Sequence, residues 1–338
     1  MKQLLADLGD AERHLRLRAE RIPGLREHAD ALARLQTLAT VRPRVILVGE
    51  SNVGKTSIAN LLLDQAVLPD SVVTNTRRPL VLHHAATVGV VGLGPGGRID
   101  LLAGPAGIAE VSSIERLEVG LPSDRLLSFD LVDTPGLTEA DGLDPLELRT
   151  SDVLLWCTIA TQAWKASERG LWMALPARHR RDAILVVTHR DALRREEDVA
   201  KVAGRLAIET EGCFRSTVFV GAIADDGQPA ETPGGNGLLD LERRIEESLA
   251  AIAHRRRRAA YRIASHIVRD SVTVIAGGRS VSPLRALAAR LRRRRRPAWR
   301  SIMRLPTPNV RERRLRPSRG RGLVLVDAPA RTRKAVGP

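Results

Sequence analysis

An eight-residue run, Gly49–Thr56 (G-E-S-N-V-G-K-T), carries the side chains best suited to phosphate chemistry in this chain of 338 residues. It fits the pattern G-x4-G-K-[ST], in which glycines let backbone N–H groups turn toward a polyphosphate. Lys55 is predicted to reach the β- and γ-phosphates, and Thr56 to ligate Mg2+. The residues assigned to nucleotide binding here are Gly49, Asn52, Val53, Gly54, Lys55, Thr56 and Ser57.

The flanking sequence supplies the elements that such a loop needs. The apolar stretch 45–48 precedes the run, and the helix-forming stretch 57–63 follows it. A strand–loop–helix order would place the loop at the positive end of a helix dipole, which favours anions. Binding of a nucleotide is therefore the first functional expectation.

Two further motifs follow apolar strands. Residues 131–136 (L-V-D-T-P-G) end in D-x-x-G, so Asp133 is expected to hold Mg2+ through a water and the Gly136 N–H to contact the γ-phosphate. Residues 188–191 (T-H-R-D) stand where GTPases carry [NT]-K-x-D. The Asp191 carboxylate would accept two hydrogen bonds from guanine, and adenine lacks this donor pair. The residues assigned to the base are Thr188, His189 and Asp191, with the His189 imidazole stacking in place of the usual lysine.

At this point the sequence resembles the dynamin family of large GTPases, over about residues 44–222. Residues 76–82 (T-R-R-P-L-V-L) look like its switch I segment, and residues 131–138 (L-V-D-T-P-G-L-T) look like its switch II segment. The resemblance implies GTP/GDP and Mg2+ as cofactors, GTP hydrolysis, a helical bundle, nucleotide-dependent homodimerisation and frequent action on membranes. It also implies that Thr76 closes over the γ-phosphate and positions the attacking water. The catalytic residues so assigned are Thr76, Ser51 and Gly136, and the metal ligands are Thr56, Thr76 and Asp133.

The catalytic details depart from the family pattern. Leu137 stands where small GTPases place a water-orienting glutamine, and Glu139 stands where dynamins have a lysine. Ser51 and Asn52 replace a glutamine and a serine of dynamins, and both can still hydrogen-bond. We therefore expect nucleotide binding to be retained and intrinsic hydrolysis to be slow.

The order of elements predicts an α/β fold, a P-loop GTPase domain with a mostly parallel sheet covered by helices on both faces. The expected strands are 44–48, 80–83, 87–92, 127–132, 152–157, 183–187 and 216–220, and the expected helices include 55–64, 165–175 and 193–208. Segment 93–123 is interpreted as an insertion. The tryptophans at 156, 164 and 172 are expected to pack rather than to stack on bases.

Helical patterns flank this domain on both sides. One interpretation packs the flanking helices together as a partial helical bundle, and the other lays them on the sheet. The arginines of 255–258 are expected to form a solvated helix face. The predicted domains are 1–40 (N-terminal bundle helices), 41–236 (GTPase domain), 237–278 (C-terminal bundle helix) and 279–338 (Arg-rich, disordered tail).

Positive charge is concentrated at the C-terminal end. Residues 279–338 hold 18 arginines and one lysine against Glu312 and Asp327, and the rest of the chain is close to neutral. Such a block favours phosphate backbones or anionic lipid as partners. A shifted reading frame in a GC-rich gene is the competing interpretation, because the sequence turns abruptly to Arg, Pro and Ala.

Composition also bears on location. Two cysteines form no disulfide framework and suit a reducing compartment. The N-terminus lacks the apolar segment of a signal peptide, and no apolar stretch reaches the roughly 18 residues needed to span a bilayer. The expected location is the cytoplasm, with peripheral contact at the inner face of the membrane.

Three hypotheses remain open. The favoured one is a GTP-hydrolysing dynamin-like switch, supported by residues 76–82. The second is a ribosome- or RNA-associated GTPase, because the loop G-x-S-N-V-G-K-[ST] also resembles bacterial ribosome-assembly GTPases and the basic tail could hold RNA. The third is a GTP-binding platform with little turnover, which Glu139 favours.

Overall fold

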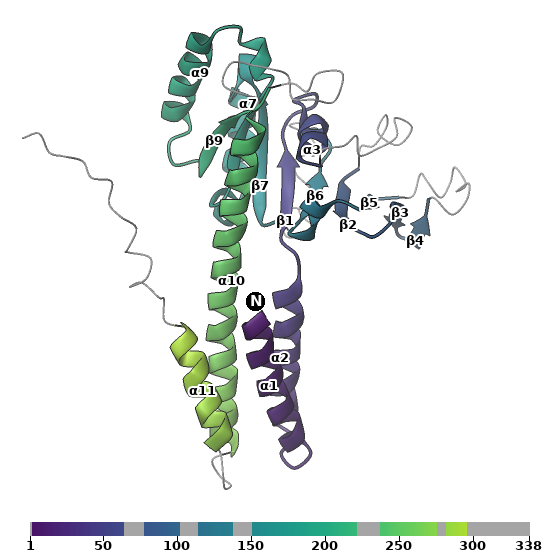
Figure 1. The fold of residues 1–338 in the computed structure, drawn as a ribbon, viewed down its shortest axis with the longest axis vertical. Helices are drawn as coiled ribbons and strands as arrows, with labels where there is room; N and C mark the ends of the chain where they lie inside the picture. Colours follow the sequence, from purple (N-terminus) through teal and green to yellow (C-terminus); the bar gives the residue numbers. More distant parts are fainter. Residues whose placement is uncertain are drawn as a thin grey trace, which may run out of the picture. The chain divides into compact units, whose positions relative to one another are not determined.

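The computed structural model describes residues 2–63, 78–101, 114–137, 151–221, 237–275 and 282–295. Within these residues, nine strands form one mixed sheet (Figure 1). The strand order is β4-β3-β5-β2-β6-β1-β7-β8-β9. The strands are β1 (Arg44–Val48), β2 (Leu80–His84), β3 (Gly89–Gly94), β4 (Gly97–Asp100), β5 (Arg116–Leu121), β6 (Asp130–Asp133), β7 (Val153–Ile159), β8 (Ile184–Thr188) and β9 (Ser216–Phe219).

The half of the sheet from β6 to β9 is entirely parallel. On the other side, β2 runs antiparallel to β6 and parallel to β5, while β3 runs antiparallel to both β5 and β4. The predicted α/β fold with a mostly parallel sheet is confirmed. The segment 93–123 had been interpreted as an insertion, but it contributes β4 and β5, so part of it extends the sheet.

The α-helices of the described residues are α1 (Lys2–Ala19), α2 (Leu25–Thr40), α3 (Lys55–Leu63), α7 (Ala166–Ala174), α8 (Ala177–Arg180), α9 (Glu196–Glu209), α10 (Leu238–Ile275) and α11 (Ser282–Arg295). Short 3-10 turns are η1 (Asp124–Leu127), η2 (Ala160–Gln162) and η3 (Arg190–Ala192). Within these ranges, none of the helices combines the length and apolar character needed to cross a bilayer.

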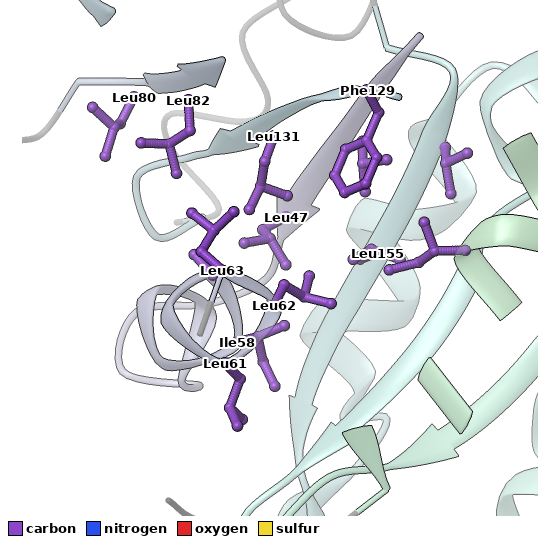
Figure 2. Close-up of a cluster of buried hydrophobic side chains, with 14 of the residues drawn as sticks. Leu47, Ile58, Leu61, Leu62, Leu63, Leu80, Leu82, Phe129, Leu131 and Leu155 are labelled. Atoms are coloured by element: carbon purple, nitrogen blue, oxygen red, sulfur yellow. The ribbon is translucent and has the colours of Figure 1, made fainter. Parts of the chain in front are cut away.

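Alternation along β1 explains why helices cover both faces of the sheet. Successive side chains of a strand point to opposite faces. Val45 and Leu47 therefore join one buried cluster with residues of α3 and α10, part of which Figure 2 shows. Ile46 and Val48 join a second cluster with residues of α7 and α9. The predicted packing of three tryptophans is confirmed, because Trp156, Trp164 and Trp172 are all buried in this second cluster.

A separate hydrophobic core lies between α1, α2, α10 and α11, which run side by side in Figure 1. Helix α10 contributes to two cores. Leu241 and Ile245 belong to the same cluster as Val45 and Leu47 of the sheet. Tyr261 and Val268 belong to the hydrophobic core of the helical bundle. The flanking helices thus form a partial bundle, as the first interpretation had it, rather than surface helices on the sheet.

Helix α11 differs from the expectation of a tail that begins at residue 279. Leu287 and Leu291 are four residues apart, share a helix face and are buried in the bundle core. The guanidinium of Arg290 lies 3.3 Å from the carboxylate of Asp7, which is 1% exposed. The surrounding arginines obscure this apolar face in the sequence. Residues 296–338 lie outside the described residues, and the proposed domain boundaries stay predictions.

The arginines of 255–258 are not all solvated, which corrects that expectation. Arg256 donates to both carboxylate oxygens of Asp152, at 2.6 and 2.7 Å, and Arg255 pairs with the buried Asp182. Both acidic residues lie just before parallel strands of the sheet. The middle of α10 is therefore anchored to the sheet by two ion pairs.

Replacing Leu291 by alanine is expected to lower the free energy of unfolding by about 2–5 kcal/mol, because the truncation leaves a cavity in the bundle core. Denaturant unfolding followed by circular dichroism measures this change. Arg285→Ala, at an exposed position on the same helix, is the matched control and should change stability little. Equal stability of the Leu291 variant and the wild type would show that α11 does not pack in solution.

Candidate functional site

The phosphate loop is the connection between β1 and α3. Lys55, the first residue of α3, is 7% exposed, and its Nζ donates to the carbonyls of Gly49 at 3.1 Å and Glu50 at 2.8 Å. Burial lowers the pKa of this lysine, and the neighbouring Asp133 carboxylate acts in the opposite direction. The ammonium is thus held inside the curve of the loop, where a polyphosphate would be bound.

Close packing beneath the loop explains its first glycine. A Cβ atom at Gly49 would lie 2.4 Å from the carbonyl oxygen of Cys157 on β7, which is far inside van der Waals contact. The side chains of Ser51, Asn52 and Ser57 are exposed to solvent at or near the loop.

The two predicted metal ligands within the described residues lie together. Thr56 Oγ1 donates to Asp133 Oδ2 at 2.7 Å. The other oxygen, Asp133 Oδ1, is buried and has no hydrogen-bond partner among the described residues. Burial raises the pKa of Asp133, and the Thr56 hydrogen bond and the Lys55 charge lower it. A hydroxyl and a carboxylate with an unsatisfied oxygen fit Mg2+, which prefers oxygen ligands.

The D-x-x-G segment runs directly against the phosphate loop. A Cβ atom at Gly136 would lie 2.2 Å from Ser51 Oγ, so a side chain cannot fit there. The next residue, Leu137, donates its N–H to the Gly49 carbonyl at 2.9 Å, and its side chain is 5% exposed in the core. The structure therefore brings Ser51 and Gly136 together. Thr76, Thr138 and Glu139 lie outside the described residues.

The base motif contacts the same loop from the other side. Thr188 Oγ1 donates to the Val53 carbonyl at 2.8 Å and lies 3.1 Å from the Thr158 carbonyl. His189 follows in the left-handed conformation with φ 54°, and a Cβ atom at Gly54 would lie 3.4 Å from its Cε1. Asp191, on η3, exposes its side chain to solvent. The three residues assigned to the base thus lie at the end of β8 and directly after it, beside the phosphate loop.

The end of β9 also reaches this motif. The N–H of Arg190 donates to the carbonyl of Val220 at 3.1 Å. The sequence predicted a strand over residues 216–220, and the structure places the end of this strand next to the T-H-R-D turn.

One group of residues at the loop was missed by the sequence reasoning. The carboxylate of Glu50 accepts hydrogen bonds from Lys165 Nζ at 2.9 Å and Ser167 Oγ at 2.6 Å. The partners lie more than a hundred positions away along the chain. The only local signal was an acidic residue inside a loop that is predicted to bind anions.

The cysteine beneath the loop yields a prediction on thiol reactivity. Burial raises the pKa of Cys157 to about 12, and the thiol is fully buried. At pH 8 its thiolate fraction is on the order of one in ten thousand, so we expect only Cys213, which is partly exposed, to react rapidly with a disulfide reagent. Counting the thiols that react before and after unfolding measures this, with Cys213→Ser as the control. Two equally fast thiols in the folded protein would contradict the burial of Cys157.

Known proteins are similar to parts of this chain in sequence and in fold. Residues 44–208 match the profile of a protein family described as 50S ribosome-binding GTPase. A stretch of 164 residues is 30% identical to Dynamin-like protein 2 of Campylobacter jejuni subsp. jejuni serotype O:23/36 (strain 81-176), covering 45% of this chain and 27% of that protein. The chain thus spans about a quarter of the length of that curated relative.

Two solved structures are similar to a larger share of this chain. Both are described as an oligomerised bacterial dynamin pair that provides a mechanism for long-range sensing and tethering of membranes. Their TM-scores are 0.52 and 0.51, at 19% and 18% identity. Each match covers 74% of this chain, and 42% and 41% of the solved chains. At this identity the match establishes a shared fold.

Proposed function

We propose, on the premise that residues 44–208 of this chain form a GTPase domain with dynamin-like relatives, that the protein binds GTP with Mg2+, hydrolyses it and acts as a nucleotide-dependent switch. In this proposal Lys55 binds the β- and γ-phosphates, and Asp191 reads the guanine base. Thr56, Asp133 and Thr76 hold the metal. Hydrolysis requires a water that attacks the γ-phosphate, and Thr76 would position it.

The observation that carries the proposal is the pairing of Thr56 with Asp133 at 2.7 Å. These residues come from two motifs that are distant in sequence, and they meet beside the Lys55 ammonium. The unsatisfied Asp133 oxygen supports a cation at this point. When bound, Mg2+ would neutralise charge that develops on the phosphate oxygens.

Slow intrinsic turnover is part of the proposal. Leu137 is buried in the core, so its side chain has neither the polarity nor the position to orient a water. Glu139 has the opposite charge to the dynamin lysine. We propose that a nucleotide-dependent homodimer completes the site, because Leu137 and Glu139 replace the glutamine and the lysine that stand at these positions in other GTPases. Hydrolysis per molecule should therefore rise with protein concentration.

We further propose that the protein works in the cytoplasm and contacts a membrane peripherally. Both cysteines are unpaired, which suits a reducing compartment. The bacterial dynamin pair is described as sensing and tethering membranes, and the Arg-rich residues beyond 295 would favour anionic lipid. RNA is the alternative polyanion for these arginines.

Multiple-turnover GTP hydrolysis tests the proposal. Turnover should depend on Mg2+, rise with protein concentration and rise again with anionic vesicles, while neutral vesicles should have no effect. Stimulation by RNA and not by vesicles would favour an RNA-associated GTPase instead. Tight GTP binding without turnover under every condition would favour a binding platform. A wild type that fails to bind GTP would refute all three functions.

A further inference from the structure

A polar network joins the phosphate loop to the start of α7. The Glu50 carboxylate accepts from Ser167 and from Lys165, and these hydrogen bonds lower the pKa of Glu50. The carboxylate also faces the N-terminus of a helix, where negative charge is stabilised. Each carboxylate oxygen thus accepts one hydrogen bond from a donor at the start of α7, which fixes the direction of the Glu50 side chain.

The turn that carries Lys165 is itself fixed by buried groups. Glu168 is 1% exposed, and its Oε2 accepts from the Lys165 N–H at 2.8 Å and from Thr158 Oγ1 at 3.0 Å. Trp164 adopts φ 64°, a conformation that is unfavourable for a bulky residue, and its N–H donates to Thr158 Oγ1. Such strain persists only where the surroundings enforce the conformation. The position of Lys165 is therefore imposed by the fold.

The same network also contacts the phosphate loop at a second point, Val53. The carbonyl of Thr158 lies 3.1 Å from Thr188 Oγ1, which donates to the Val53 carbonyl. The loop is therefore held at Glu50 and at Val53 by groups connected through the end of β7. The backbone of Glu50 also bridges to Leu137, directly after Gly136. Displacement of Glu50 would move the segment that meets the γ-phosphate.

We propose that Glu50 is a positioning residue for GTP hydrolysis: its pairing with Lys165 and Ser167 holds the phosphate loop and the Gly136 segment at the spacing that the γ-phosphate requires. This inference rests on the proposed GTPase function. Glu50 acts through the backbone around it and contacts no reacting atom. Loss of its carboxylate should therefore affect turnover more than binding of GDP, which lacks the γ-phosphate.

The test compares Glu50→Ala, Lys165→Ala and the double variant in GTP turnover and in GDP affinity. Displacement of a reacting group by about 1 Å can cost about 100-fold in rate, so we expect kcat to fall by about 10- to 100-fold in each single variant. KM and GDP affinity should change less than about threefold. The double variant should be no slower than the worse single variant, because one interaction is removed in all three.

Tryptophan fluorescence provides a second readout that does not depend on turnover. In a Trp299→Phe background, the signal comes from Trp156, Trp164 and Trp172, which contact one another edge to face. Binding of a non-hydrolysable GTP analogue should change this signal in the parent protein. The change should be largely lost in Glu50→Ala, although the analogue still binds.

Matched controls separate positioning from a general structural role. Asp198→Ala and Lys201→Ala break an exposed pair on α9 and should leave kcat and the signal unchanged. Exchange of the charges, Glu50→Lys with Lys165→Glu, should recover part of the lost rate. Additive losses, or unchanged kcat in the single variants, would overturn the inference. A wild type without GTP binding would instead overturn the proposed function.

Discussion

Replacing Lys55 by alanine should weaken GTP and GDP binding by at least about 100-fold, because it removes charge-assisted hydrogen bonds to the phosphates. The ammonium is buried and held by the Gly49 and Glu50 carbonyls, so no exposed cation can replace it at the same point. Burial lowers the pKa of Lys55 in the ligand-free protein, and a bound polyphosphate would raise it. Titration with a fluorescent guanine nucleotide measures the change.

The control for this variant is Lys201→Ala, which removes an exposed lysine of α9 and should bind nucleotide like the wild type. Thermal unfolding without nucleotide distinguishes loss of the site from loss of the fold. A Lys55→Ala protein that is folded and retains its affinity within threefold would place the phosphates elsewhere.

The second large effect concerns the choice of base. Asp191→Asn should reduce the affinity for GTP and create affinity for xanthosine triphosphate, because the amide offers a donor where the carboxylate offered an acceptor. Sites that hydrogen-bond a specific group discriminate by about 10⁴–10⁵, so the ratio of GTP to xanthosine triphosphate affinity should fall by several powers of ten. Competition binding with GTP, ATP and xanthosine triphosphate measures this ratio.

Asp198→Asn is the matched control, because it makes the same change at another acidic residue of the domain. It should keep the wild-type preference for GTP. If the wild type binds ATP and GTP equally, Asp191 does not read the base, and the T-H-R-D turn has another role.

The site residues that could be predicted from the sequence are those that lie at the end of a predicted strand or follow it. Lys55, Asp133 and Thr188 follow or end apolar runs, and parallel strands bring such ends to one edge of the sheet. The Glu50–Lys165 pair could not be found this way, because its partners are joined by tertiary packing. The left-handed Trp164 has no sequence signal either, since its conformation is enforced by the residues around it.

The elements of the fold also divide into those that the sequence pattern marks and those that it does not. Strand β1 and helix α3 were predicted almost to the residue, because apolar periodicity and the glycines of the loop mark them clearly. Strands β4 and β5 were missed in a segment whose first half is rich in glycine, which weakens strand patterns. Helix α11 was missed because arginines surround its two buried leucines, and only the presence of a bundle core reveals which face packs.

The continuity of α10 has a mechanical consequence. This helix has 38 residues, and it runs unbroken from the core of the sheet into the core of the bundle. At a rise of about 1.5 Å per residue it is about 57 Å long. A tilt of about 10° at its sheet end would sweep its far end through about 10 Å, about the width of a helix. The helix would therefore act as a lever arm between the sheet and the bundle. Adding or removing one whole helical turn would change the length of this arm by about 5.4 Å.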